Sequence, residues 1–214
     1  KEYAERIKVM AKSAAARYRL LISRIFLLIM IIVLLFSDNK VDNWSPTYNW
    51  LEFFGYFFGL IGVFGRIWSS LFIEGNKTQK LIVKGPYSLM RNPLYFFSFI
   101  LLIGFCFFIK SILVFITFFL IWILIYRNTM NSEEKNLISN HNEEYIDYYN
   151  KTPKIFPNFN LYKSFGVNDK MDIDIKKIER VLTESFGFLF LFGIIKVIEY
   201  LHLSGILPVY FHLM

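Results

Sequence analysis

Residues 94–126 read LYFFSFILLIGFCFFIKSILVFITFFLIWILIY, an apolar stretch in which Lys110 is the one charged residue. As a single helix it would be about 50 Å long, whereas the hydrocarbon core of a bilayer is about 30 Å thick. The stretch must therefore fold back, and Lys110-Ser111 is the polar break near its middle. We expect two membrane spans, 94–109 and 111–126, joined by a tight turn, so that Pro93 and Arg127 are neighbours.

The composition of the whole chain agrees with a membrane protein. Of its 214 residues 55% are hydrophobic and 19% charged, and the mean hydropathy is +0.42. Soluble domains carry about 25% charged residues. The single cysteine, Cys106, excludes an intrachain disulfide and a thiolate metal cluster. The sequence thus predicts an all-α integral membrane protein.

Outside this hairpin we expect three further membrane segments, giving about five transmembrane helices. Two are the spans 20–36 and 50–64, the second short and broken by glycines, and the third lies within 181–214. Gly55, Gly59 and Gly62 fall on one face, which favours close approach of another helix, expected from the same chain. The predicted organisation is a basic interfacial helix (1–19), transmembrane helices (20–65), a core (66–158), a cytoplasmic connector (159–180) and a C-terminal membrane segment (181–214).

The basic residues alternate along the chain. Lys and Arg number seven in 1–24, five in 66–92 and nine in 127–180, against one each at Lys40, Lys110 and Lys196. This positive-inside pattern predicts a multi-pass membrane protein whose N-terminus and long polar segments are cytoplasmic. The same basic faces favour anionic lipids rather than nucleic acid. Lys196 and Glu199, three residues apart, are expected to neutralise each other or reach the interface.

The loop 85–95 (GPYSLMRNPLY) leads into the span 94–109. Pro93 removes a backbone donor and biases Asn92 away from helical angles, which predicts a helix start at this point. The loop fits two interpretations, a ligand site or a membrane-entry loop with an interfacial arginine and belt tyrosines.

Glu133 and Glu134 follow the span 111–126 and are brought by the hairpin toward Arg91, Asn92 and Tyr95. Mixed charges converging at a membrane surface suit a zwitterionic ligand. Alternatively, the two glutamates lie in the first turn of a separate helix, about 132–150, with Asn131 as its N-cap. Thr152-Pro153 and Phe156-Pro157 should end that helix.

Other familiar sites receive no support from the sequence. Neither a dinucleotide-binding glycine motif nor a Walker loop is present. His141 with Glu144 could suggest a metal, but the chain has three histidines in total, and we place His141 on a solvated helix face. We expect no metal site.

An ordered set of motifs resembles the isoprenylcysteine carboxyl methyltransferase and phospholipid methyltransferase superfamily. The resemblance covers roughly residues 60–158. Its parts are Arg66 and Trp68, Gly85-Pro86-Tyr87, Arg91-Asn92-Pro93-Leu94-Tyr95, Glu133-Glu134 with Leu137, Glu144-Tyr145, Tyr148, Pro153 and Phe156-Pro157.

This resemblance implies methyl transfer from S-adenosylmethionine, bound in a cytoplasmic-side pocket, to a lipophilic acceptor that enters from the bilayer. The implied catalytic residues are Arg91, Glu133 and Glu134. The implied cofactor-binding residues are Tyr87, Arg91, Asn92, Pro93, Leu94, Tyr95, Arg127, Glu133 and Glu134. Carboxyl methyltransferases usually have His where this chain has Asn92, whereas phospholipid N-methyltransferases have Asn-Pro. The acceptor is thus either a prenylcysteine carboxylate or a phospholipid or other lipid head group.

Two other functions remain open at this point. One is an NADPH-dependent membrane reductase of the sterol-reductase type, which shares a related C-terminal architecture. The other is a non-enzymatic helix-packing subunit built on the glycine face of 55, 59 and 62. The reductase would bind NADPH instead of S-adenosylhomocysteine, and the packing subunit would bind neither.

Overall fold

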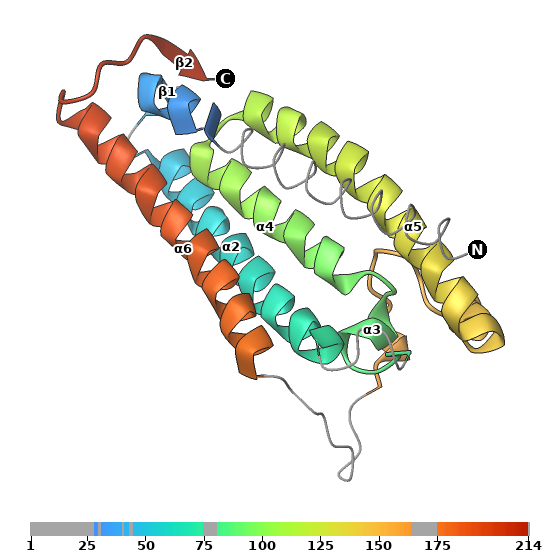
Figure 1. Cartoon of the computed structure of the whole chain (residues 1–214). Helices are drawn as coiled ribbons and strands as arrows, with labels where there is room; N and C mark the ends of the chain where they lie inside the picture. The colour runs from blue at the N-terminus through green and yellow to red at the C-terminus, as the bar shows by residue number, and fades with distance from the viewer. Residues whose placement is uncertain are drawn as a thin grey trace, which may run out of the picture. The chain divides into compact units, whose positions relative to one another are not determined.

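The computed structural model describes residues 28–29, 31–39, 41–42, 45–74, 81–163 and 175–213. The elements run in the order β1 (Ser37–Asn39), α2 (Pro46–Glu74), α3 (Pro86–Leu89), α4 (Pro93–Ile109), α5 (Ile112–Lys151), a 3₁₀ turn η1 (Phe159–Leu161), α6 (Ile175–Leu203) and β2 (Phe211–Leu213) (Figure 1). The chain divides into two compact units, 1–38 with 195–213 and 39–194. The candidate site lies entirely in the second unit.

The first unit is described only in part. The predicted interfacial helix 1–19 and most of the predicted span 20–36 lie outside the described residues, although 31–36 are helical. The strands β1 and β2 pair, and the Tyr210 N–H donates to the Phe36 carbonyl. Lys196 Nζ lies 2.5 Å from Glu199 Oε2, which confirms their expected pairing.

The predicted hairpin is confirmed, with α4 and α5 joined at Lys110-Ser111. Lys110 adopts left-handed angles (φ 58°), and Ser111 caps α5 by accepting a hydrogen bond from the Val114 N–H. Lys110 Nζ is buried 3.5 Å from a carboxylate oxygen of Glu52 and 3.9 Å from the centre of the Tyr48 ring. The polar break is therefore stabilised by an ion pair and a cation–π contact.

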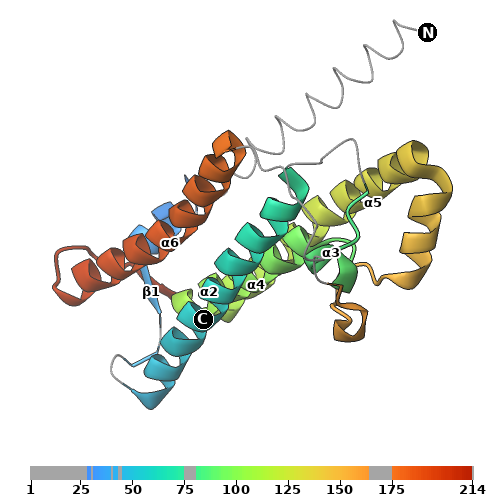
Figure 2. The ribbon, with the colours of Figure 1, turned by 90° about the horizontal axis from the view of Figure 1, so that it is seen from below.

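The helix α2 is longer than predicted, because it runs through its glycines without a break. A Cβ on Gly104 of α4 would lie 2.6 Å from the Gly59 backbone nitrogen, and one on Gly62 would lie 2.7 Å from the Leu101 backbone. The glycines thus let α2 and α4 pack backbone against backbone, and the two helices lie side by side in both ribbon views (Figures 1 and 2). The expected partner from the same chain is confirmed.

The helix α5 corrects a second prediction. It runs without a break from Ile112 to a kink at Asn142 and continues beyond the kink to Lys151, so Asn131 is not an N-cap and the two glutamates lie inside a helix. The helix bends at Asn142, which has angles (φ 44°, ψ −121°) outside the helical region, and Figure 2 shows the change of direction. The predicted end before Thr152-Pro153 is confirmed.

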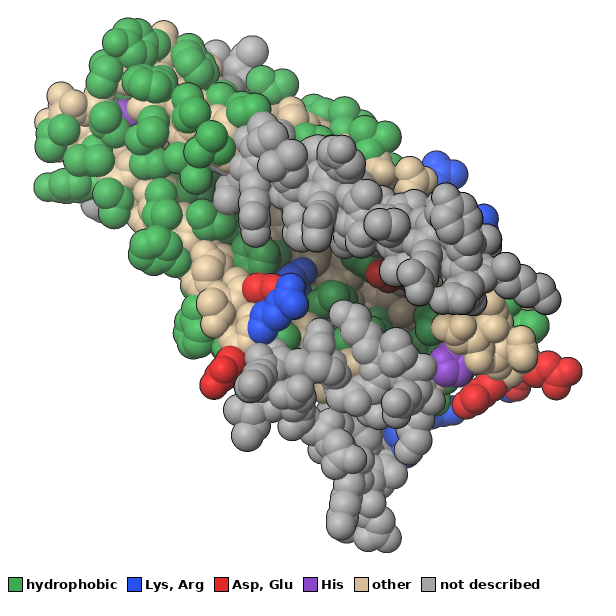
Figure 3. Space-filling model, viewed as in Figure 1, with side chains coloured by type: hydrophobic (Ala, Val, Ile, Leu, Met, Phe, Trp, Pro, Cys, Tyr) green, Lys and Arg blue, Asp and Glu red, His purple; other side chains and the backbone are tan. Residues whose placement is uncertain are grey.

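Three described helices, α2, α5 and α6, are long and apolar enough to cross a membrane. The helix α4, with 17 residues, is about 26 Å long. Hydrophobic side chains cover the first half of α5, and charged ones gather around its far end (Figure 3). The protein is thus an all-α integral membrane protein, as predicted.

Candidate functional site

An open cavity lies where α3 and the start of α4 face the middle of α5. It comprises about 920 Å³ of space between and beside protein atoms, open solvent included. Its lining is mixed, with apolar and aromatic side chains around a few charged ones. The lining residues are Ile73, Leu81, Ile82, Tyr87, Arg91, Asn92, Pro93, Leu94, Tyr95, Glu133, Glu134, Leu137, His141, Tyr145 and Tyr148.

Glu134 is the centre of the polar part of this cavity. Its Oε1 accepts hydrogen bonds from Arg91 Nε (3.1 Å) and Asn92 Nδ2 (3.3 Å), and its Oε2 accepts one from Lys154 Nζ (2.9 Å). The side chains of Arg91 and Glu134 are 8% and 9% exposed. Two cations and an amide therefore fix this carboxylate in place.

The Arg91 side chain also binds the C-terminal end of α5. Its Nη1 donates to the carbonyls of Tyr149 (2.6 Å) and Thr152 (2.7 Å), and its guanidinium lies 3.9 Å from the centre of the Tyr149 ring. The backbone N–H groups of Arg91 and Asn92 donate to the carbonyls of residues 153 and 154. The third nitrogen of the Arg91 guanidinium, Nη2, donates to no acceptor within the described part of the chain.

Four tyrosines form the aromatic part of the lining: Tyr87, Tyr95, Tyr145 and Tyr148. The Tyr148 hydroxyl donates to the Tyr87 carbonyl (2.6 Å). Burial, helped by the charge of Glu134, raises the pKa of Tyr145 to about 12. Burial also raises the pKa of Tyr148. Both phenols therefore stay neutral near pH 7 and act as hydrogen-bonding and stacking surfaces.

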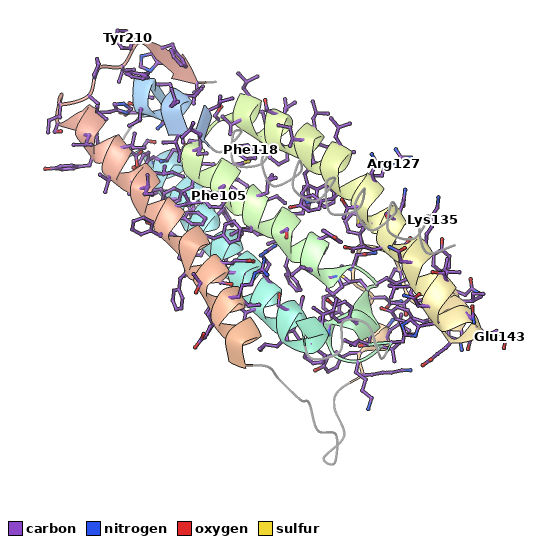
Figure 4. The ribbon with its side chains drawn as sticks, in the orientation of Figure 1. Phe105, Phe118, Arg127, Lys135, Glu143 and Tyr210 are labelled. Atoms are coloured by element: carbon purple, nitrogen blue, oxygen red, sulfur yellow. The ribbon has the colours of Figure 1, made fainter. Side chains whose placement is uncertain are left out.

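The cavity brings together all of the predicted cofactor residues except Arg127. Arg127 is exposed and absent from the lining. Figure 4 shows it on the outer side of α5 with Lys135 and Glu143, away from α4. The proximity of Arg91 and Asn92 to Glu134, expected from the hairpin, is confirmed. Glu133 also lines the cavity, but its side chain is exposed.

One lining residue was placed wrongly by the sequence interpretation. His141 is half-buried against the cavity instead of lying on a solvated helix face. Because α5 is continuous, positions 134, 137 and 141 recur at three and four residues and share one face. The sequence carried this signal, because all three positions also lie within the predicted helix 132–150.

The fold and the cavity define an integral membrane protein with a polar ligand site at one end of a helix hairpin. Residues 50–144 match the model of the phospholipid methyltransferase family. This match confirms the predicted resemblance to the integral membrane methyltransferase superfamily and indicates a methyltransferase. The matched segment contains every lining residue except Tyr145 and Tyr148.

Two curated relatives span nearly the whole chain. The nickel-cobalt-cadmium resistance protein NccN of Alcaligenes xylosoxydans xylosoxydans is 28% identical over 92% of this chain and 91% of its own length. The cobalt-zinc-cadmium resistance protein CzcN of Cupriavidus metallidurans is 28% identical over 89% of this chain and 86% of its own length. No solved structure matches the chain.

Proposed function

We propose that the protein is a membrane methyltransferase that transfers the methyl group of S-adenosylmethionine to a lipid-like acceptor. The observation that carries this proposal is the cavity itself. It combines an exposed carboxylate, a braced guanidinium and four tyrosines, of which Tyr87 and Tyr95 lie within the segment that matches the methyltransferase family.

The side chains of the cavity fit the charged groups of this cofactor. Glu133 suits the ammonium group, because its carboxylate is exposed at the lining and accepts no hydrogen bond from described residues. Arg91 Nη2 and the N-terminal turn of α4, which begins with Pro93 and has no side-chain cap, suit the carboxylate. The tyrosine faces suit the sulfonium cation and the adenine ring.

Bound S-adenosylmethionine would supply an electrophilic methyl group, so the protein has mainly to orient the acceptor and exclude water. The Glu134 cluster stiffens the cavity wall, since one carboxylate joins α5 to the loops at 91–92 and 154. A carboxylate or phosphate acceptor is ionised at pH 7 and needs no base. An amine acceptor must lose a proton, and Glu133 is better suited than Glu134, which already accepts three hydrogen bonds.

The orientation follows from the charge pattern of the sequence. We place the N-terminus and the cavity on the cytoplasmic side, where the basic segments 1–24, 66–92 and 127–180 belong. The acceptor reaches the cavity laterally from the bilayer, and anionic lipids gather at the same basic surface.

Ligand binding followed by product identification tests the proposal. The full chain, purified in detergent, is expected to gain thermal stability with S-adenosylhomocysteine and none with NADPH. Incubation with methyl-labelled S-adenosylmethionine and extracted membrane lipids should yield a labelled lipid that mass spectrometry identifies. Stabilisation by NADPH alone would indicate the reductase, and stabilisation by neither compound would favour the helix-packing subunit. Arg127→Ala serves as the control that preserves binding.

A further inference from the structure

A second charged cluster lies around Arg66 of α2. The Arg66 side chain is 17% exposed and lies inside the apolar helix segment Pro46–Ile73. Its Nη1 donates to Ser98 Oγ of α4, and its Nη2 lies 4.0 Å from Glu184 Oε2 of α6. The guanidinium also lies 5.1 Å from the centre of the Phe188 ring. An arginine that is largely buried among apolar helices is costly and points to a function.

The positive charge of Arg66 is incompletely balanced. Within the described part of the chain, Glu184 is the one carboxylate that pairs with it, at the outer limit of an ion pair. Glu184 is 51% exposed and lies closer to a second arginine, Arg180, at 3.2 Å. Two arginines thus share one carboxylate, which leaves a net positive charge. Because these surroundings hold little water, an additional anion would stabilise the Arg66 guanidinium.

Arg66 lies beside the candidate cofactor cavity, on the same helix faces. Ser98 follows the lining residue Tyr95 by three residues on α4, a separation of about 5 Å along one face. On α2 the lining residue Ile73 follows Arg66 by seven residues, about two turns and about 10 Å. A lipid group bound at Arg66 would therefore lie one to two helical turns from the cavity, toward the middle of α2 and α4.

The part of α6 that faces Arg66 has open positions beside Phe188 among the described residues. A Cβ added to Gly187, the residue before Phe188, would meet no atom within 4 Å, and Phe186 is 65% exposed. This helix approaches α2 and α4 through side chains such as Phe192 rather than through its backbone. Figure 3 shows basic and acidic side chains grouped at the edge of a hollow on this face.

We propose that Arg66, supported by Ser98, binds the anionic group of a lipid acceptor, a phosphate or a carboxylate, and directs the adjacent part of the head group toward the cavity. The identification of this lipid as the acceptor rests on the proposed methyltransferase function. The lipid site itself does not depend on methyl transfer and can be tested without the cofactor.

Equilibrium binding to the full chain in mixed micelles tests the site with three labelled probes. These are dioleoyl phosphatidic acid, oleate and the uncharged dioleoylglycerol. We expect preferential binding of one anionic probe, and the preferred probe shows whether phosphate or carboxylate is recognised. Arg66→Gln should weaken that binding about tenfold, the effect of losing one charged hydrogen bond. The control Arg127→Gln removes an exposed arginine outside this cluster and should change binding less than about twofold.

A second variant keeps the test decisive even if Arg66→Gln fails to fold. Glu184→Gln removes the competing carboxylate at a half-exposed position, and it should strengthen binding of the anionic probe about threefold. Three results would each overturn the proposal. They are equal affinity for dioleoylglycerol and the anionic probes, unchanged affinity for the anionic probe in folded Arg66→Gln, and no increase of that affinity in Glu184→Gln. S-adenosylhomocysteine binding is measured in parallel. If it is absent while lipid binding depends on Arg66, the methyltransferase proposal fails and the lipid site stands.

Discussion

Arg91 Nε and Glu134 Oε1 lie 3.1 Å apart, although 43 residues and a membrane hairpin separate them in the chain. Each side chain is less than 10% exposed. Through Lys154 and the carbonyls of Tyr149 and Thr152, the same pair also holds the segment that follows α5. The pair therefore organises the cavity as well as lining it.

Glu134 and its neighbour Glu133 should respond differently to the same substitution. Glu134→Gln leaves Arg91 and Lys154 without their shared anion, and breaking a buried pair of this kind costs about 3–5 kcal/mol. We expect a lower unfolding temperature and loss of S-adenosylhomocysteine binding. Glu133→Gln, at an exposed position, should weaken cofactor binding while leaving the unfolding temperature within a degree or two.

Thermal unfolding and ligand titration of the two single variants check this prediction. Arg127→Ala, outside the cavity, should match the wild type in both measurements. Equal thermal stability of Glu134→Gln and wild type would contradict the structural role given to this carboxylate.

Asn142 occupies backbone angles that favour glycine, φ 44° and ψ −121°. A non-glycine residue in such a region costs about 1–3 kcal/mol. We expect Asn142→Gly to raise the free energy of unfolding by about 1 kcal/mol. The matched control, Asn140→Gly, lies at an ordinary exposed helical position and should lower it by about the same amount. Denaturant titration of both variants measures the two changes, and a loss of stability in Asn142→Gly would show that the amide side chain matters more than the backbone angles.

The pKa of Tyr145, raised from 10.0 to about 12 by burial and by Glu134, predicts an alkaline instability. Between these two values the unfolded chain releases the phenolic proton while the folded chain retains it. The free energy of unfolding therefore falls as the pH rises from about 10 toward 12. Thermal melts between pH 9 and 11.5 should show a smaller decrease for Tyr145→Phe than for the wild type. Parallel decreases would show that Tyr145 is not the group responsible.

The contact between α2 and α4 makes Gly104 intolerant of any side chain. A Cβ at this position would lie 2.6 Å from the Gly59 nitrogen and 2.9 Å from the Gly55 carbonyl oxygen. Because both obstacles are backbone atoms, Gly104→Ala should cost about 1–3 kcal/mol or more. Gly187→Ala in α6, where a Cβ meets nothing within 4 Å, should be neutral or stabilising by up to about 1 kcal/mol. Unfolding in mixed micelles compares the two, and equal stabilities would contradict close backbone packing.

Much of this architecture is predictable from local sequence. The apolar run broken at Lys110 predicts the hairpin, since its length exceeds the thickness of a bilayer. Pro93 predicts the start of α4, and Thr152-Pro153 the end of α5. Once the hairpin is assumed, the proximity of Arg91 and Glu134 follows without knowledge of any ligand.

Other features depend on contacts that no local pattern contains. From the sequence alone, the glycines of α2 are expected to break the helix. In the structure α2 is continuous, and its glycines contact the backbone of α4. The acidic pair reads as a helix start, yet Arg91, Asn92 and Lys154 fix Glu134 in mid-helix. That continuity places His141 in the cavity and leaves Arg127 outside it.

The sequence by itself determined the membrane class, the hairpin and most of the residues around the cavity, because chain length, proline and charge act locally. Tertiary structure alone decided what each charge does. It fixed Glu134 as the buried anchor and left Glu133 exposed at the cavity, because neighbouring positions on a helix point about 100° apart and only one of them faces Arg91.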